Sequence, residues 1–294
     1  MEEILKIPKR PFISPLRYPG GKSRLARLLC KFILRNFADY SNLTIVEPFA
    51  GGAGASLALL DAGIVDHVII NDYDKSIYAF WQTAVNNSDY LIDKIKSTRI
   101  SIAEWHRQRA CYLKKDSSLE ELAYATFFLN RTNRSGIIQG RPIGGLKQRG
   151  IWNLKSRFDK KKMIERFKHI KGFSQKISVS NLDALELLKS YNDGKSHNEI
   201  LLFLDPPYYK HGTELYLNSF TDDDHKILAN HLLSSNMRWI MTYDDHAFVR
   251  SLYVRTKKRH YKLGHCAHRP KIGDELILVS PNLIMVPLRP YNDF

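Results

Sequence analysis

The chain has 294 residues, a hydrophobic fraction of 44% and a formal net charge of +15 at pH 7. This length accommodates a complete α/β core together with a second, smaller module. The sequence has no apolar stretch of transmembrane length and begins without the apolar core of a signal peptide, which argues against a membrane or exported protein. Its three widely spaced cysteines form no C-x-x-C pair and favour a reducing, cytoplasmic setting.

The positive charge is concentrated in two segments. Residues 131–171 contain thirteen Lys or Arg and two acids, and residues 255–271 contain seven Lys or Arg and no acid. The remaining residues together are close to neutral, at −3. Basic charge gathered in this way favours a polyanionic partner, nucleic acid ahead of acidic lipid, over a surface that merely confers solubility.

The first part of the chain alternates between predicted helices and strands. Apolar residues recur at helical spacing, whereas short β-branched runs end at glycines or polar residues. Alternation of this kind is typical of a parallel sheet. In chain order, we predict a helix at 22–40, a strand at 44–47, a helix at 55–62, a strand at 67–70 and a helix at 74–85.

A segment of helices and loops interrupts this alternation. The pattern is helical over 90–130, has no sustained period over the glycine-rich 131–157, and predicts a basic helix at 158–170. Strands then follow at 177–179, 200–204, 239–242, 275–279 and 283–286, with helices from Asp183 and from Thr221, where Asp224 completes a capping box.

These elements predict an α/β fold with a Rossmann-like, mostly parallel sheet and helices on both faces. The sheet is built from residues 1–88, which form the cofactor-binding half, and residues 173–294, which form the catalytic half. Residues 89–172 form a smaller inserted domain of helices and loops, and this domain carries most of the basic charge. We therefore expect the insert to recognise the polyanion.

The most informative motif is Asp205-Pro206-Pro207-Tyr208, which directly follows the apolar run 200–204. The pattern predicts a buried strand that ends at a rigid turn, where the prolines fix the backbone and hold their carbonyls as acceptors. A carboxylate, fixed carbonyls and an aromatic face suit a flat molecule with an amino group, such as an adenine flipped out of a duplex. The alternative is a strand end followed by an ordinary surface turn.

A glycine loop, Glu47-Pro48-Phe49-Ala50-Gly51-Gly52-Ala53-Gly54, lies between a predicted strand and a predicted helix. Glycines let the backbone approach a ligand, but a carboxylate at the strand end disfavours phosphate and suits an ammonium or hydroxyls. Asp72 ends the next strand, where an acid accepts hydrogen bonds from ribose hydroxyls. A nucleoside that carries an amino acid meets both demands, so the two motifs predict S-adenosylmethionine as the ligand. The alternative is a dinucleotide-binding or purely structural turn.

The segment Arg17-Tyr18-Pro19-Gly20-Gly21-Lys22 precedes the first predicted helix. Free N–H groups of glycines at a helix start, together with the charge of Lys22, suit a carboxylate such as that of methionine. Tyr18 is expected to pack on the cofactor. The alternative is a turn followed by a solvated lysine.

These motifs together resemble those of the Dam-like, D12 class of DNA adenine-N6 methyltransferases, over about residues 12–279. The matching segments are Tyr18–Lys22, Glu47–Gly54 with one residue of difference, Asp72, Leu129–Gly136, Asp205–Tyr208, Phe220–His225, Arg269 and Glu275–Leu278. The basic insert falls where this family has its recognition domain. It does not closely follow the versions associated with GATC recognition, so the recognition sequence stays open.

The resemblance implies transfer of a methyl group from S-adenosylmethionine to N6 of a flipped-out adenine in duplex DNA, without a metal. It implies a cytoplasmic monomer or weak dimer in a bacterial, archaeal or phage-infected cell, acting with or without a cognate restriction endonuclease. The expected catalytic residues are Asp205, Pro206, Pro207 and Tyr208. The expected cofactor-binding residues are Tyr18, Gly20, Lys22, Glu47, Phe49, Gly51, Gly52, Gly54, Asp72 and Asp205. The expected DNA-binding residues are Asn130, Arg131, Arg134, Arg141, Lys147, Arg149 and Arg157.

Two other functions are alternatives. A methyltransferase that acts on RNA or on cytosine N4 has similar demands, and Asp205 favours adenine N6 in DNA through the family resemblance alone. A non-catalytic DNA-binding relative is disfavoured because Glu47, Asp72 and Asp205 are all present. The spacing of His260, His265, Cys266 and His268 fits no common zinc pattern, and Trp81, Trp105, Trp152 and Trp239 are expected in the core or at an interface.

Overall fold

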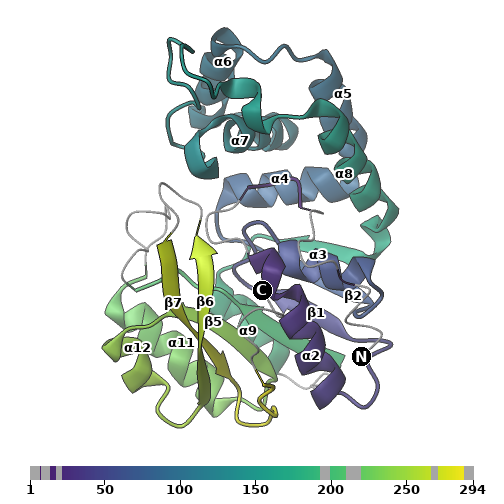
Figure 1. Cartoon of the computed structure of the whole chain (residues 1–294). Helices are drawn as coiled ribbons and strands as arrows, with labels where there is room; N and C mark the ends of the chain where they lie inside the picture. Colours follow the sequence, from purple (N-terminus) through teal and green to yellow (C-terminus); the bar gives the residue numbers. More distant parts are fainter. Residues whose placement is uncertain are drawn as a thin grey trace.

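The computed structural model describes residue 7 and residues 14–17, 22–192, 199–209, 220–265 and 271–287. Its strands are β1 (Thr44–Glu47), β2 (His67–Asn71), β3 (Ile177–Ser180), β4 (Ile200–Leu204), β5 (Trp239–Asp244), β6 (Lys257–His265) and β7 (Lys271–Val279). They form one sheet in the order β3-β2-β1-β4-β5-β7-β6 (Figure 1). β1 to β5 are parallel, and β7 runs antiparallel between β5 and β6. The predicted Rossmann-like, mostly parallel sheet is therefore confirmed.

Helices occupy the connections between these strands, and α4 to α8 all lie between β2 and β3. The helices are α2 (Ala26–Asn36), α3 (Gly54–Asp61), α4 (Lys75–Asn86), α5 (Ser88–Ser97), α6 (Ile102–Leu113), α7 (Leu119–Thr132), α8 (Lys160–Gly172), α9 (Ala184–Asn192), α11 (Asp222–Ser234) and α12 (Ala247–Leu252), with 3₁₀ helices η1 (Lys22–Leu25), η2 (Arg134–Gly136), η3 (Leu154–Arg157) and η4 (Ser174–Lys176). The predicted capping box of Thr221 and Asp224 begins α11.

The central strands are buried on both faces. Along β4, Leu201 and Phe203 belong to one cluster of apolar side chains, and Leu202 and Leu204 belong to another. The first cluster includes α2 and α3, and the second includes α9, α11 and α12. Because successive side chains of a strand point to opposite faces, these two groups of helices cover opposite faces of the sheet.

The segment that contains α5 to α8 stands at one end of the molecule, beyond α4 (Figure 1). Its core is continuous with that of the sheet layer. The rings of Phe80 in α4, Phe127 in α7 and Phe167 in α8 have centroids 5.3 to 6.2 Å apart. The insert is thus attached through a packed aromatic cluster, while the domain division at residues 88/89 and 172/173 stays a prediction.

The C-terminal part departs from the sequence prediction in two places. The strand β6 was missed because four consecutive basic residues, 257–260, hide its alternation, although this edge position of a sheet tolerates charged side chains. The strand predicted at 283–286 is wrong, because this segment forms a turn and coil. Leu283 and Val286 are buried, whereas Ile284 is half exposed and pairs with the side chain of Asn36 through two hydrogen bonds instead of with a neighbouring strand.

The first predicted helix ends earlier than expected, at Asn36 rather than Tyr40. The same side chain explains this end, because the Asn36 amide also donates to the carbonyl oxygen of Phe32 over 2.9 Å. Among the described residues, no helix has both the length and the apolar character needed to cross a bilayer.

Candidate functional site

Three acidic side chains lie at the carboxyl ends of neighbouring strands. Glu47 is the last residue of β1, Asp72 directly follows β2, and Asp205 directly follows β4. The order β2-β1-β4 places these strands side by side, and the strand order reverses between β1 and β4. In open α/β sheets, ligands bind outside the carboxyl ends of strands at such a reversal. The fold therefore brings the three predicted acids to one candidate site.

The glycine loop between β1 and α3 is fixed by the end of β2. The backbone N–H of Gly51 donates to Asp72 Oδ2 over 2.9 Å, and Trp81 Nε1 donates to the Gly51 carbonyl oxygen over 2.8 Å. The φ angle of Gly51 is 46°, in the left-handed region that favours glycine. A Cβ on Gly54 would approach the Cβ of Ser23 to 3.0 Å, so this glycine permits close packing of α3 on η1.

Burial raises the pKa values of Glu47 and Asp72. Glu47 is 4% exposed and accepts hydrogen bonds from the N–H and hydroxyl groups of Ser56, but the loss of water dominates and raises its pKa to about 8. The loss of water raises the pKa of Asp72 to about 7, against hydrogen bonds from the N–H groups of Asp74 and Gly51. A cation or hydroxyl donor beside either acid would favour its ionised form.

Asp205 is held through its oxygen Oδ1. The hydroxyl of Thr242 in β5 donates to this atom over 2.6 Å, and Lys22 Nζ lies 3.5 Å from it. Burial raises the pKa of Asp205, while the charge of Lys22 and the bond from Thr242 oppose that rise. Pro206, next in the chain, is buried. Thr242 and Lys22 thus hold the Asp205 carboxylate in place, while the role of the proline carbonyls as acceptors stays a prediction.

Lys22 is a buried ammonium that contacts two carboxylates. It is 7% exposed, and its Nζ lies 3.1 Å from Glu275 Oε2 as well as near Asp205. It also donates to the Tyr208 hydroxyl over 2.5 Å. These contacts exclude the alternative of a solvated lysine, while a contact of Lys22 with a cofactor carboxylate stays a prediction. The expected neighbours Tyr18 and Gly20 lie outside the described residues.

Tyr208 contributes more than an aromatic face. Its hydroxyl donates to Glu275 Oε2 over 2.7 Å, and its ring stacks on that of Tyr243 with centroids 6.2 Å apart. Glu275 in β7 was not predicted as a site residue, although it lies in the matched segment 275–278. Only the folded structure shows that Glu275 is 2% exposed, because no local sequence pattern predicts which distant residues surround this side chain.

The five other basic residues expected to contact DNA are all exposed and lie between α7 and α8. They are Arg134, Arg141, Lys147, Arg149 and Arg157. No acidic residue occurs between Glu121 and Asp159, so this stretch carries uncompensated positive charge. Their contact with DNA stays a prediction.

Asn130 and Arg131, in contrast, are not presented to a ligand. Asn130 is fully buried; its Oδ1 accepts from the N–H of Arg17 over 2.7 Å, and its Nδ2 donates to the carbonyl oxygens of Arg17 and Gly136, each over 2.9 Å. Arg131 is 8% exposed, and burial lowers its pKa to about 9. Both side chains contact the protein's own backbone, so the expectation that they contact DNA is corrected to a structural role.

The exposed loop that precedes α8 carries two apolar side chains, Ile151, which the sequence interpretation did not single out, and Trp152, which it expected in the core or at an interface. Ile151 is 95% exposed and Trp152 is 63% exposed, and the Arg157 guanidinium lies 5.7 Å from the Trp152 ring centroid. The Gln148 side chain braces this loop, since it donates to the Ile143 carbonyl oxygen over 2.7 Å and accepts from the Leu154 N–H over 3.0 Å. Trp152 is therefore not a core residue, unlike the other three tryptophans.

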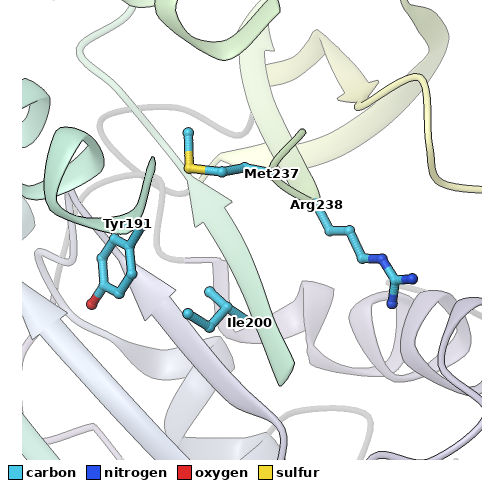
Figure 2. Close-up of a pocket in the computed structure, with 4 residues that line it drawn as sticks. All are labelled: Tyr191, Ile200, Met237 and Arg238. Atoms are coloured by element: carbon cyan, nitrogen blue, oxygen red, sulfur yellow. The ribbon is translucent and has the colours of Figure 1, made fainter. Parts of the chain in front are cut away.

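A small hollow lies away from these acids. Tyr191, Ile200, Met237 and Arg238 line it (Figure 2), at the beginning of β4, whereas Asp205 follows the end of that strand. Within the described ranges, no three His, Cys, Asp or Glu side chains are grouped as a metal site would require. Cys266 and His268 lie outside those ranges.

The fold is that of an α/β protein whose acids gather at the carboxyl ends of parallel strands, the edge at which such sheets bind their ligands. The sequence profile of the D12 class N6 adenine-specific DNA methyltransferases matches residues 18–265. The chain belongs to this family, and the predicted resemblance is confirmed. It is therefore an adenine-specific DNA methyltransferase.

Two proteins illustrate the range of similarity. The Type II methyltransferase M.CviBI of Paramecium bursaria Chlorella virus NC1A is 24% identical over 258 residues, which cover 83% of this chain and 91% of that protein. The rRNA methyltransferase aviRa of Streptomyces viridochromogenes is 14% identical, with a TM-score of 0.42, over 90% of this chain and 86% of that one. A second structure of aviRa gives 15% identity and a TM-score of 0.41, over 95% and 91% of the two chains.

Glu47→Gln should remove a pH dependence of stability. Because the pKa of Glu47 is raised on folding, the folded state binds the proton more tightly, and stability falls as pH rises from about 4.5 towards about 8. Urea unfolding should show that the free energy of unfolding of the wild type falls between pH 6 and pH 9 by on the order of 2–4 kcal/mol more than that of the variant. Asp93→Asn, which removes an exposed carboxylate, is the control. Equal pH dependence in all three proteins would contradict the burial argument.

Gly136→Ala should destabilise the contact between η2 and the N-terminal segment. Gly136 has a φ of 80°, and an added Cβ would meet the Arg17 carbonyl oxygen at 2.1 Å. We expect a loss of about 2 kcal/mol or more in urea unfolding. Gly172→Ala is the matched control, because nothing lies within 4 Å of the added atom. A Gly136→Ala protein as stable as this control would rule out the close approach.

Proposed function

We propose that this enzyme transfers a methyl group from S-adenosylmethionine to N6 of an adenine flipped out of duplex DNA. The observation that carries the proposal is the turn after β4, where Thr242 and Lys22 both contact Oδ1 of Asp205. Pro206 and Tyr208 follow in the same turn. This turn lies where the strand order reverses, so a base and a cofactor can meet at one edge of the sheet.

The chemistry of the gathered acids fits the cofactor. Glu47 and Asp72 are carboxyl groups with raised pKa values, beside a loop that turns through Gly51. Acids at these positions suit an ammonium and ribose hydroxyls better than phosphates. We assign the amino acid part of S-adenosylmethionine to the Glu47 side of the loop and the ribose to Asp72. When bound, S-adenosylmethionine supplies an electrophilic methyl group on a sulfonium.

The role of Asp205 is to orient the adenine amine. The N6 lone pair of adenine is delocalised into the ring, which makes it a poor nucleophile. Oδ2 of Asp205 and the carbonyl oxygen of Pro206 would accept the two N6 hydrogens, and this favours a pyramidal nitrogen with its lone pair available. Fixed acceptors of this kind act through position and charge, so Asp205 need not be a strong base.

The role of Tyr208 is to stack on the flipped base. Unstacking a base from a duplex costs a few kcal/mol, which contact with an aromatic face offsets. The ring is held from behind by Tyr243 and its hydroxyl is held by Lys22 and Glu275. A ring fixed in this way loses little further freedom when the base arrives.

The insert would supply the duplex contacts. Its exposed basic residues suit backbone phosphates, which position the protein without reading sequence. Ile151 and Trp152 stand exposed among them, so they are candidates for apolar contacts with bases. The viral relative carries the name of a type II methyltransferase, and we extend this to a role for the present enzyme alongside a cognate restriction endonuclease.

The first experiment is to incubate the protein with tritiated S-adenosylmethionine and mixed-sequence duplex DNA, followed by digestion to nucleosides. Label in N6-methyldeoxyadenosine is the expected result, and mapping of the modified sites then gives the recognition sequence. Label in N4-methylcytosine, or label only when RNA replaces DNA, would overturn the proposal.

Asp205→Asn should lose at least about 10²- to 10³-fold in kcat, because the amide no longer supplies a charged acceptor to the adenine amine. Duplex binding, measured by fluorescence anisotropy, should stay within about threefold of wild type, since the insert carries the phosphate contacts. Asp223→Asn, in an exposed position of α11, is the control and should keep full activity. Undiminished methylation by Asp205→Asn would refute the assigned role.

The double variant Arg149→Ala/Arg157→Ala should bind duplex DNA more weakly and with a smaller response to salt. If each side chain contacts one phosphate, the slope of log Kobs against log salt should fall in magnitude by about 2. Lys226→Ala, which removes a lysine of α11 paired with Asp223, should leave the slope unchanged. The footprint on the insert is wrong if the double variant and this control give the same slope.

A further inference from the structure

Glu275 is the centre of a buried cluster that reaches the proposed catalytic turn. Its oxygen Oε2 accepts hydrogen bonds from the Tyr208 hydroxyl over 2.7 Å, from Lys22 Nζ over 3.1 Å and from the Tyr261 hydroxyl. Glu275 and Tyr261 are directly opposite each other in β7 and β6. Both are nearly inaccessible, with 2% and 3% exposure. The mechanism above gives Glu275 no task beyond its contact with the Tyr208 hydroxyl, and gives Tyr261 none.

We propose that Glu275, supported by Tyr261, is a positioning residue that fixes the Lys22 ammonium and the Tyr208 hydroxyl and thereby sets the orientation of Asp205 and of the stacking ring. This inference rests on the proposed function, because it concerns the same turn. It differs from the catalytic assignment in that Glu275 acts through other side chains and does not touch the adenine.

The geometry assigns this task to Glu275 because it contacts both groups that flank the base site. A single oxygen holds the hydroxyl of Tyr208 and the ammonium of Lys22, and Lys22 in turn lies beside Asp205. Three donors around one buried oxygen define a position far better than one flexible contact. In the sheet, β5 lies between β4, which precedes Asp205, and β7, which contains Glu275. The Lys22 ammonium therefore connects two acids from strands that are not neighbours.

The charges of Lys22 and Glu275 are predicted to act on the pKa of Asp205 in opposite directions. Among the residues that the structure describes, the charged and titratable groups that act on Asp205 are Lys22, Glu47, Tyr208, Tyr261 and Glu275. The positive charge of Lys22 favours the ionised form of Asp205 and lowers its pKa, whereas the negative charge of Glu275 raises it. Removing the charge of Lys22 should therefore raise the pKa of Asp205, and removing the charge of Glu275 should lower it.

The test compares Glu275→Gln and Lys22→Met in the full-length protein. Methylation of mixed-sequence duplex DNA is measured at saturating S-adenosylmethionine between pH 5 and pH 9. The acidic limb of kcat should move to lower pH in Glu275→Gln, by about half a unit to one unit, and to higher pH in Lys22→Met, by about one unit or more. KM for DNA should change little, because the insert makes the duplex contacts. Asp223→Asn should leave the limb in place.

A second measurement separates this inference from the proposed function. The Asp205 carboxyl carbon is followed by ¹³C NMR, with Asp205→Asn used to assign its signal, in wild type and in both variants. Opposite shifts of its titration support the positioning role even if the wild type methylates no adenine, an outcome that would defeat only the proposed function. Shifts in the same direction, or none, would overturn the positioning role even with an active wild type.

A third variant guards against loss of folding. Tyr261→Phe keeps the ring and removes one donor to Glu275, so the fold should persist with a melting temperature close to that of wild type. Its kcat should fall about three- to tenfold while KM for DNA is retained, because Tyr208 and Lys22 are less firmly held. An unchanged kcat would contradict the supporting role of Tyr261.

Discussion

The site depends on one buried ammonium that holds two carboxylates together. Taking a lysine and two acids out of water costs several kcal/mol for each ion, and only close, well-oriented contacts offset that cost. Lys22, Asp205 and Glu275 come from η1, from the end of β4 and from β7, so the cluster forms only when distant parts of the chain meet. The same contact that joins the first helical turn to the sheet therefore also orients the proposed catalytic acid.

The order of the strands explains why so many acids share one edge. The neighbours β2, β1 and β4 end at Asp72, Glu47 and Asp205, and the antiparallel β7 adds Glu275 from the far side of β5. Burial raises the pKa values of Glu47 and Asp205, and the like charges nearby add to the effect. A sheet edge with several buried acids favours ligands that bring positive charge or hydroxyl donors. A nucleoside that carries an amino acid and a base with an exocyclic amine both supply such groups.

Local patterns predicted the elements whose causes are local. The apolar run before Asp205 and the capping box at Thr221 need only neighbouring residues, and both are present in the structure. The pairing of Lys22 with Glu275 joins residues 253 positions apart, which no periodicity encodes. The strand β6 was hidden by its own charge, and Asn130 was taken for a ligand contact because a buried amide and an exposed one look alike in sequence.

The loop between η2 and α8 is anchored at two buried points and braced by its own side chains in between. Asn130 binds the backbone at Gly136, and Phe158 packs its ring on Phe127, with centroids 5.3 Å apart. Between these anchors, Gln148 supplies contacts that stay within the loop. Selection can therefore exchange the exposed side chains of this loop without disturbing the acids at the sheet edge. A fold built in this way can diversify its target sequence while its chemistry stays constant.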